Sequence, residues 1–484
     1  MITFTISIVL LIIGYFVYGS FVSHVFGPDD RKTPVTIHPD GVDYIKMPIW
    51  RIYMIQFLNI AGTGPIFGAI MGALFGTSSY LWIVFGCIFG GAVHDYMAGM
   101  LSLRNDGESL PETVGRYLGK RAKIGMLIFC IIFMPLVGAV FVYSPAIIID
   151  AMTKGVDDVM FWIIIIFLYY VLATLLPIDK IIGKIYPVFA VALILMAIGL
   201  FVMLYVNFPA IPEIWDGLQN KNPDTTQPII PCLCITIACG AISGFHATQS
   251  PMMARCIKHE KYARPVFYGS MITEGVVALI WATVASYFFF DGGVANSANM
   301  AIPAPKIVQL VSEKWLGDIG YIFVLFGVVA LPITTGDTAF RSSRLMVADF
   351  FHLKQDTNLR RVLVALPLFL FAIIILYFII QYNNGFNIIW RYFGWANQAI
   401  SIMTLFAITV YLAQQRKLYW IALIPALFMT FICVDFLCVS TTVLSLPESI
   451  SLIISSICTL VAVGWFFLWL KRYNSNRLIK SEII

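Results

Sequence analysis

Two apolar stretches of this chain are interrupted by glycine and proline. The first reads QFLNIAGTGP over residues 56–65, and the second reads CGAISGFHATQSP over residues 239–251. A helix that breaks at membrane depth frees backbone amides and carbonyls, which is tolerated only where they line a cavity or bind a ligand. The pair therefore predicts a membrane carrier built from an internal repeat, with its substrate site at the two breaks.

The composition indicates that the whole chain is embedded in a membrane. Of its 484 residues, 60% are hydrophobic and only 12% are charged, whereas soluble domains carry about 25% charged residues. Stretches of about 20 apolar residues recur from end to end, and each is long enough to cross a bilayer. We therefore expect an all-α polytopic membrane protein without a sizeable soluble domain. The first 22 residues lack the basic start of a signal peptide, so they are expected to remain as a helix.

The distribution of positive charge predicts the orientation of the spans. Hydropathy predicts about 13 of them, at roughly 2–22, 50–76, 79–101, 124–150, 158–177, 183–206, 229–252, 267–289, 319–340, 362–381, 386–411, 418–440 and 449–470. Loops after odd-numbered spans and the C-terminal tail hold 26 of the 31 Lys and Arg residues, and the opposite loops hold four. Because positive loops stay in the cytoplasm, the N-terminus is expected outside the inner membrane and the C-terminus inside the cell.

The span order predicts an inverted repeat of five plus five helices. Residues 50–206 would form repeat 1 and residues 229–411 repeat 2, with an N-terminal helix and loop (1–49) and accessory helices and tail (418–484) around them. Each unit starts with a broken helix, and the two units start on opposite sides of the membrane. This order resembles that of leucine-transporter-like carriers. Glycine and proline can also mark close helix packing or a kink, but two symmetric clusters favour the carrier.

The first broken stretch is a candidate anion site. Pro65 suits the first position of a new half-helix, whose free amides and positive dipole end would attract a carboxylate. Peptides and small acids such as pyruvate both carry one. The candidate substrate-binding residues are Asn59, Ala61, Gly62, Thr63 and Gly64.

The second broken stretch adds polar side chains at membrane depth. Its candidate substrate-binding residues are Ser243, His246, Thr248 and Gln249. His246 could bind substrate or carry a proton, because the pKa of histidine lies near physiological pH. The alternative is a neutral histidine that hydrogen-bonds across helices.

Ionisable residues inside other spans are candidates for coupling, gating or substrate binding. Asp95 and Glu274 lie on the second helix of each repeat and could relay protons or pair with an arginine as a gate. Lys184 could replace a coupling ion, or extend its amine to the membrane surface. Arg391 could clamp a carboxylate with two hydrogen bonds, or anchor an aromatic belt.

Four longer motifs resemble the carbon starvation protein A (CstA) family. They read FLNIAGTGPIFG (57–68), GFHATQSPMMARC (244–256), LPITTGDTAFRSSRLMVADF (331–350) and WRYFGWANQ (390–398). The resemblance implies a fold of the APC superfamily and uptake of peptides or of pyruvate-like carboxylates when carbon is scarce. It also implies a small cytoplasmic companion protein for some members.

Sodium-coupled carriers of the leucine-transporter-like fold share a cation site between the first broken helix and the third helix of repeat 2. The corresponding candidates here are the carbonyls of Ala61 and Gly64 with the side chains of Thr334, Thr335, Asp337 and Thr338. Such oxygen ligands suit Na⁺, so Na⁺ is the one candidate ion and no other cofactor is expected. Proton coupling remains an alternative, as does an ion pair from Asp337 to Arg341 one turn later.

The sequence contains no motif typical of an enzyme. It has no phosphate-binding loop or nucleophile with a base, and Cys232 and Cys234 lack zinc-site spacing. We expect the nine cysteines to be packing residues. The predicted function is secondary active import of peptides or small carboxylates coupled to H⁺ or Na⁺. A membrane sensor binding the same ligands is the alternative, and a channel would need rings of like charge.

Overall fold

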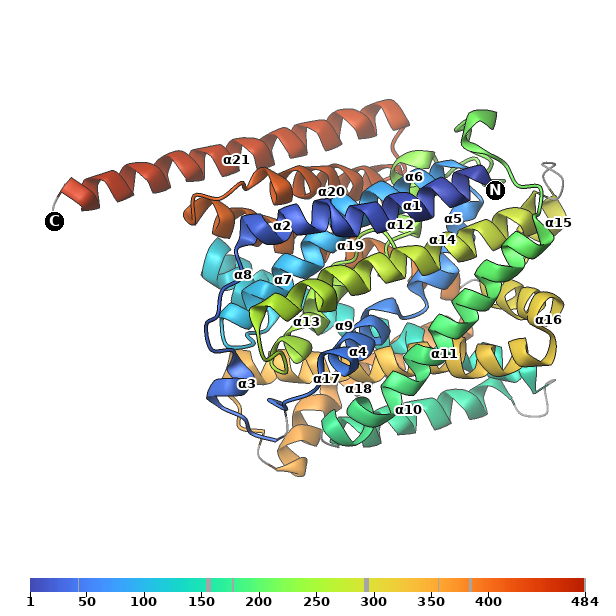
Figure 1. Ribbon diagram of the computed structural model, residues 1–484, viewed down its shortest axis with the longest axis horizontal. Helices are drawn as coiled ribbons and strands as arrows, with labels where there is room; N and C mark the ends of the chain where they lie inside the picture. Colours follow the sequence, from blue (N-terminus) through green and yellow to red (C-terminus); the bar gives the residue numbers. More distant parts are fainter. Residues whose placement is uncertain are drawn as a thin grey trace.

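The computed structural model describes residues 1–41, 43–153, 158–175, 178–290, 296–355, 357–382 and 385–482. Every regular element in these residues is helical. The long helices run side by side, with the N-terminus at one end of the bundle and the C-terminus beyond the other (Figure 1). Within the described residues, nine helices are long and apolar enough to cross a bilayer, and a bent pair makes a tenth span.

Helices occur at each of the predicted spans. The N-terminal span is α1 (Ile2–Phe16) and α2 (Tyr18–Phe26), followed by the short α3 (Pro34–Ile37). The first five-helix unit comprises α4 (Ile49–Ala61), η1 (Gly64–Gly68), α5 (Ala69–Ala73), α6 (Ser78–Phe85), η2 (Gly86–Gly91), α7 (Ala92–Arg104), α8 (Leu110–Leu118), α9 (Lys120–Met152), α10 (Val159–Leu175) and α11 (Ile178–Asn207).

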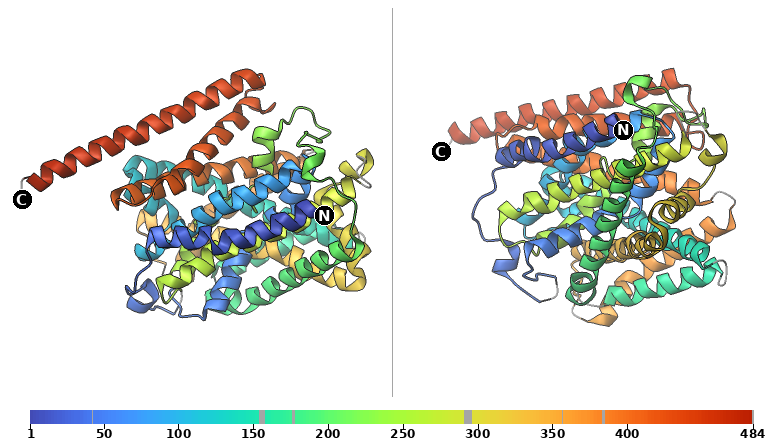
Figure 2. Two further views of the ribbon diagram at one scale, coloured as in Figure 1. Left: turned by 45° about the horizontal axis from the view of Figure 1, so that its top comes forward. Right: turned by 45° about the vertical axis from the view of Figure 1, so that its right-hand side comes forward.

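The second unit follows a loop that contains η3 (Ile214–Asp216). It comprises α12 (Ile229–Thr236), α13 (Phe245–Ala254), η4 (Glu260–Tyr262), η5 (Arg264–Gly269), α14 (Ser270–Phe289), α15 (Ser297–Met300), α16 (Ala304–Phe323), η7 (Val324–Val329), α17 (Ala330–Phe351), α18 (Asn358–Gln381) and α19 (Gly385–Gln414). The accessory helices are α20 (Trp420–Val439) and α21 (Glu448–Glu482). Figure 2 shows α21 diverging from the bundle toward its C-terminal end.

Helix packing follows the inverted repeat. Repeat 1 places α5 and η1 against α14 of repeat 2, and repeat 2 places α13 against α7 of repeat 1. In the same way, α9 packs on α17 and α18, while α17 packs on α9 and α10. Exchanging the two units therefore preserves the pairs of neighbours, which brings both broken helices to the centre.

The first break consists of Gly62 and Thr63. Gly62 has φ +49° and ψ −155°, a conformation that side-chain-bearing residues rarely adopt, and the chain bends by 54° between α4 and the segment Gly64–Ala73. Membrane depth makes this turn costly unless neighbouring groups satisfy the backbone. This break lies within the stretch 56–65 that was predicted to be interrupted.

The second break spans residues 237–244 and is longer than the first. Gly240 has φ +92°, and a Cβ atom there would lie 2.5 Å from that of Ala278. We expected the break to extend to Pro251, but α13 already begins at Phe245 and continues through that proline. Within α13, Thr248 Oγ1 donates to Phe245 O and Ser250 Oγ donates to His246 O.

The half-helix that follows the first break is in direct contact with the second broken helix. A Cβ atom added to Gly64 would lie 2.3 Å from Cys239 Cβ and 2.5 Å from its Sγ, distances that real atoms do not tolerate. A Cβ atom on Gly68 would likewise lie 2.8 Å from Thr236 O. Glycine in the first half-helix thus allows the backbone of one repeat to touch the other.

Candidate functional site

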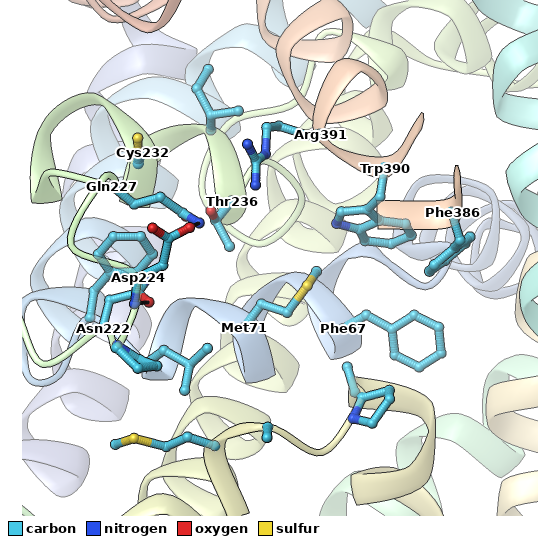
Figure 3. A pocket seen from close by; sticks show the side chains of 18 of the residues that line it. Phe67, Met71, Asn222, Asp224, Gln227, Cys232, Thr236, Phe386, Trp390 and Arg391 are labelled. Carbon is cyan, nitrogen blue, oxygen red and sulfur yellow. Dashed lines mark hydrogen bonds between the residues drawn. The ribbon is translucent and has the colours of Figure 1, made fainter. Parts of the chain in front are cut away.

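A cavity of about 770 Å³ opens between the broken helices and one end of the bundle. Figure 3 shows Arg391, Thr236, Gln227 and Asp224 on one side of it, and the aromatic rings of Phe67, Trp390 and Phe386 on the other. Its further lining comes from α5, α16, the end of α20 and the segments 222–227 and 300–303. The cavity therefore combines a polar wall with an aromatic wall.

Arg391 is the predicted substrate residue that lines this cavity. Partial burial raises the pKa of the nearby Asp224 carboxyl, but hydrogen bonds from Thr226 and Gln227 and the charge of Arg391 outweigh that effect, so the pKa is lowered. Asp224 is thus a carboxylate near the Arg391 guanidinium at neutral pH. The Arg391 guanidinium could bind the carboxylate of a zwitterionic ligand, and the Asp224 carboxylate could bind its ammonium group.

The other predicted substrate residues lie deeper than the described lining of the cavity. Asn59, Thr63, Ser243, His246, Thr248 and Gln249 are all buried, as are Ala61, Gly62 and Gly64. Within the described part of the chain, the polar side-chain atoms of Gln56, Asn59 and Thr63 have no hydrogen-bond partner. Because native proteins pair almost all such groups, this region beside the first break is suited to a polar ligand.

The polar residues of the second break and of α13 bond to one another and to α19. Ser243 Oγ donates to Asn397 Oδ1 at 3.0 Å, and the same oxygen accepts from Phe245 N at 2.7 Å. Gln249 Nε2 lies 3.0 Å from Thr248 Oγ1. Asn397 therefore fixes the start of α13, a role that the WANQ motif alone did not reveal.

Asp95, His246 and Glu274 come together at the centre, although they lie on three different helices. His246 Nδ1 is 2.7 Å from Asp95 Oδ2, and His246 Nε2 is 3.4 Å from Glu274 Oε2. His94 Nδ1 also approaches Asp95 Oδ1 at 2.8 Å. The described partners of both carboxylates are thus histidines, rather than the arginine of a predicted gate.

Cys239 lies beside this group. Its Sγ, a ring nitrogen of His246 and a carboxylate oxygen of Glu274 lie within 4.8 Å of one another. Sequence reasoning missed this arrangement, because the three residues come from a loop and two helices and have no local metal-binding spacing.

Of the predicted cation residues on α17, Thr335 contacts α4, through Leu58 O and not through the predicted carbonyls of Ala61 and Gly64. Thr335 Oγ1 lies 3.2 Å from Leu58 O on α4 and 2.9 Å from Leu331 O on its own helix. Thr334 and Thr338 donate to carbonyls of α17. Asp337 Oδ2 accepts from Tyr186 at 2.8 Å, a partner that was not predicted. The side chain of Lys184 lies outside the described residues.

The end of the bundle opposite the cavity is held by a cluster around Arg104. Its guanidinium donates to both carboxylate oxygens of Glu260, at 2.8 and 2.7 Å, to Tyr411 at 2.8 Å and to Gly27 O at 2.6 Å. Arg391 and Tyr411 lie about 30 Å apart along α19, at about 1.5 Å per residue. The cavity is therefore open at one end while ion pairs close the other.

Comparison with known proteins agrees with this architecture. The family model described as carbon starvation protein CstA matches residues 1–160, 147–301 and 291–435. An uncharacterized membrane protein of Haemophilus influenzae is 43% identical over 60% of this chain and 91% of its own. The peptide transporters CstA of Bacillus subtilis and Escherichia coli are 27% and 25% identical, each over 87% of this chain and over 87% and 78% of their own lengths.

Solved transporters share the fold at low sequence identity. A manganese transporter of Eremococcus coleocola superposes with a TM-score of 0.57 at 12% identity, covering 90% of this chain and 99% of its own. Mhp1, a nucleobase-cation-symport-1 family transporter, gives 0.54 at 12% identity, over 90% and 96%. These matches confirm the predicted leucine-transporter-like fold, while the exact number of membrane crossings stays a prediction.

Proposed function

We propose that this chain, which belongs to the carbon starvation protein CstA family, is a secondary active transporter that imports short peptides or small carboxylates. Relatives named as peptide transporters support a membrane transport function. In this proposal the inner membrane holds the chain with its N-terminus outside, so the cavity opens to the exterior. Uptake would then serve the cell when carbon is limiting.

The observation that carries the proposal is the one-sided cavity. It reaches from one end of the bundle to the half-helix that follows the first break, while the Arg104 cluster closes the far end. A carrier that alternates access needs such a state, with the central site open to one side only. A channel would instead need a continuous polar pore.

The cavity chemistry favours a peptide over a very small acid. Arg391 can hold a carboxylate, Asp224 can hold an ammonium group, and the aromatic wall suits side chains. The volume of about 770 Å³ falls in the range of pockets that hold drug-sized ligands. Di- and tripeptides match these features, and pyruvate is the small-carboxylate alternative.

Coupling to Na⁺ or H⁺ completes the proposal. The contact of Thr335 with Leu58 O supports a Na⁺ site between α4 and α17. The buried carboxyl groups of Asp95 and Asp337 support the proton alternative, because ionisable groups at membrane depth are retained for function. A pH gradient and a Na⁺ gradient imposed separately on the same vesicles would distinguish the two.

Uptake by proteoliposomes tests the function. We expect labelled di- or tripeptides to accumulate against their gradient, and Arg391→Gln to lower uptake at least tenfold, with Arg472→Gln on the exposed face of α21 as the matched control. Accumulation of pyruvate alone would change the substrate class. Binding without accumulation under either gradient would replace the transporter with a membrane sensor.

A further inference from the structure

We propose that Cys239, His246 and Glu274 form a binding site for a divalent transition-metal ion of borderline softness, such as Zn²⁺, at the second break. The three residues are buried and are contributed by the loop 237–244, α13 and α14. The proposal concerns binding of the ion itself and does not depend on the transport activity.

The donor atoms already have a spacing that suits a metal ion. They lie within 4.8 Å of one another, and His246 Nε2 is 3.4 Å from Glu274 Oε2. In a tetrahedral zinc site with bonds of about 2.1 Å, nitrogen and oxygen ligands lie about 3.4 Å apart. Small rotations of the Cys239 side chain would bring its sulfur to the same centre.

His246 is oriented as metal-bound histidines are. Asp95 Oδ2 lies 2.7 Å from Nδ1, so the carboxylate can accept a hydrogen bond from an Nδ1–H group, which leaves the Nε2 lone pair facing Glu274. A carboxylate behind a ligating histidine fixes its tautomer and raises its basicity. Asp95 is thus a positioning residue, and its own contact with His94 fixes it in turn.

The thiol is also positioned. Cys239 Sγ lies 3.7 Å from Ser243 Oγ and 3.7 Å from Asn397 Nδ2. The amide of Asn397 can donate to a thiolate, which is the form of cysteine that binds metal. Close contact with Gly64 limits movement of this side chain away from the centre.

Charge balance favours a cation here. Asp95 and Glu274 are fully buried, and the described ionic partner of each is a histidine, with His246 Nε2 lying 3.4 Å from Glu274 Oε2. Burying a carboxylate without a compensating charge is costly. Asp95, Glu274 and a Cys239 thiolate together carry three negative charges, of which one divalent ion offsets two. Sulfur and imidazole donors select a transition metal over Na⁺, Mg²⁺ or Ca²⁺, which prefer oxygen ligands alone.

A protonated His246 bridging the two carboxylates is the competing explanation. It accounts for the short contact with Asp95, but the 3.4 Å separation from Glu274 is long for a charge-assisted hydrogen bond. It also gives no role to the adjacent thiol. The two explanations differ in whether the purified protein binds a metal ion stoichiometrically.

Cobalt binding to the full-length protein provides the test. Chelator-treated protein in nanodiscs would be titrated with Co²⁺, whose bond to a thiolate gives a strong near-ultraviolet charge-transfer band. We expect one Co²⁺ per chain with this band, displacement by Zn²⁺ and no displacement by excess Mg²⁺. Absence of stoichiometric binding would overturn the proposal and leave the histidinium bridge.

Variants then assign the ligands. Cys239→Ser should abolish the charge-transfer band. His246→Gln and Glu274→Gln should each weaken Co²⁺ binding at least tenfold. Cys130→Ser, at a buried cysteine on α9, is the control and should keep the band and the affinity unchanged. Asp95→Asn should weaken binding without removing the band. An unchanged band in Cys239→Ser would contradict the site.

If the ligand variants do not fold, X-ray absorption spectroscopy of zinc bound to the unaltered protein tests the site. One sulfur neighbour at about 2.3 Å together with nitrogen or oxygen neighbours at about 2.0–2.2 Å supports the site. A shell made only of oxygen would overturn it.

Discussion

The two breaks occupy equivalent places in the repeats, yet their surroundings differ. The first is two residues long and lies beside Gln56 and Asn59, whose amide groups are buried without partners in the described structure. The second is eight residues long. Ser243 within it bonds to α19, and His246 directly after it, on α13, bonds to α7.

This difference shows that two equivalent places in the repeats have different hydrogen bonding. A buried polar group without a partner costs about 1–3 kcal/mol, so the neighbourhood of the first break is costly until a ligand or a conformational change satisfies it. The second break is already held by hydrogen bonds. We therefore expect substitutions at the first to affect binding, and substitutions at the second to affect stability.

A substitution at the contact between the two broken helices should lower both stability and uptake. Gly64→Ala places a methyl group 2.3 Å from Cys239 Cβ and 2.5 Å from its Sγ. We expect a loss of about 3 kcal/mol in stability, at the upper end for overpacking, and uptake below about a tenth of the original. Thermal unfolding and peptide uptake measure the two effects.

Gly125→Ala is the matched control, because a Cβ there meets nothing within 4 Å. Helix propensity makes that change neutral or stabilising by up to about 1 kcal/mol. Full activity of Gly64→Ala would show that the two broken helices are not in contact in the working protein.

A change at the second break should act mainly on stability. Asn397→Ala removes the acceptor for Ser243 Oγ and Phe245 N, which are both buried. We expect a loss of about 2–3 kcal/mol from two groups left without partners. Comparison of thermal unfolding with Asn207→Ala, an exposed asparagine bonded to its own helix, would isolate the effect.

At the first break, we expect a substitution to weaken peptide binding without lowering stability. Asn59→Leu replaces a buried, unpartnered amide with an apolar group of similar size, so stability should stay equal or rise by about 1 kcal/mol. Peptide binding should weaken about tenfold, which corresponds to about 1.4 kcal/mol. Unchanged affinity measured by calorimetry would remove Asn59 from the binding site.

The smallest expected effect concerns the proposed cation site. Thr335→Val keeps the shape but removes the hydroxyl that contacts Leu58 O. If Na⁺ drives transport, the Na⁺ concentration for half-maximal uptake should rise about tenfold. Thr409→Val, whose hydroxyl bonds only within α19 among the described contacts, is the control. An unaltered Na⁺ response would favour protons.

Local sequence patterns predicted most of the fold. The broken stretch around Gly62, the helical segments and the repeat follow from hydropathy and from glycine and proline, because both act locally. The end of the second break at Gly244 was predicted less well, since α13 continues through Pro251 although proline usually ends or kinks a helix.

The site was predicted less completely because it depends on contacts between distant segments. Arg391 and His246 were identified as unusual polar residues in apolar surroundings. Contacts between the repeats were not predicted. Cys239 meets Gly64, and Asp337 meets Tyr186, only once the two five-helix units pack together. Asp95 and His246 bond across 151 positions of sequence.

The Arg104 cluster has a kinetic consequence. Any opening of that end must separate an arginine from Glu260, Tyr411 and Gly27 O at once, so water has to reach these charges before substrate can leave. Salt weakens such interactions as they become exposed. The rate at which the closed end opens should therefore rise with ionic strength.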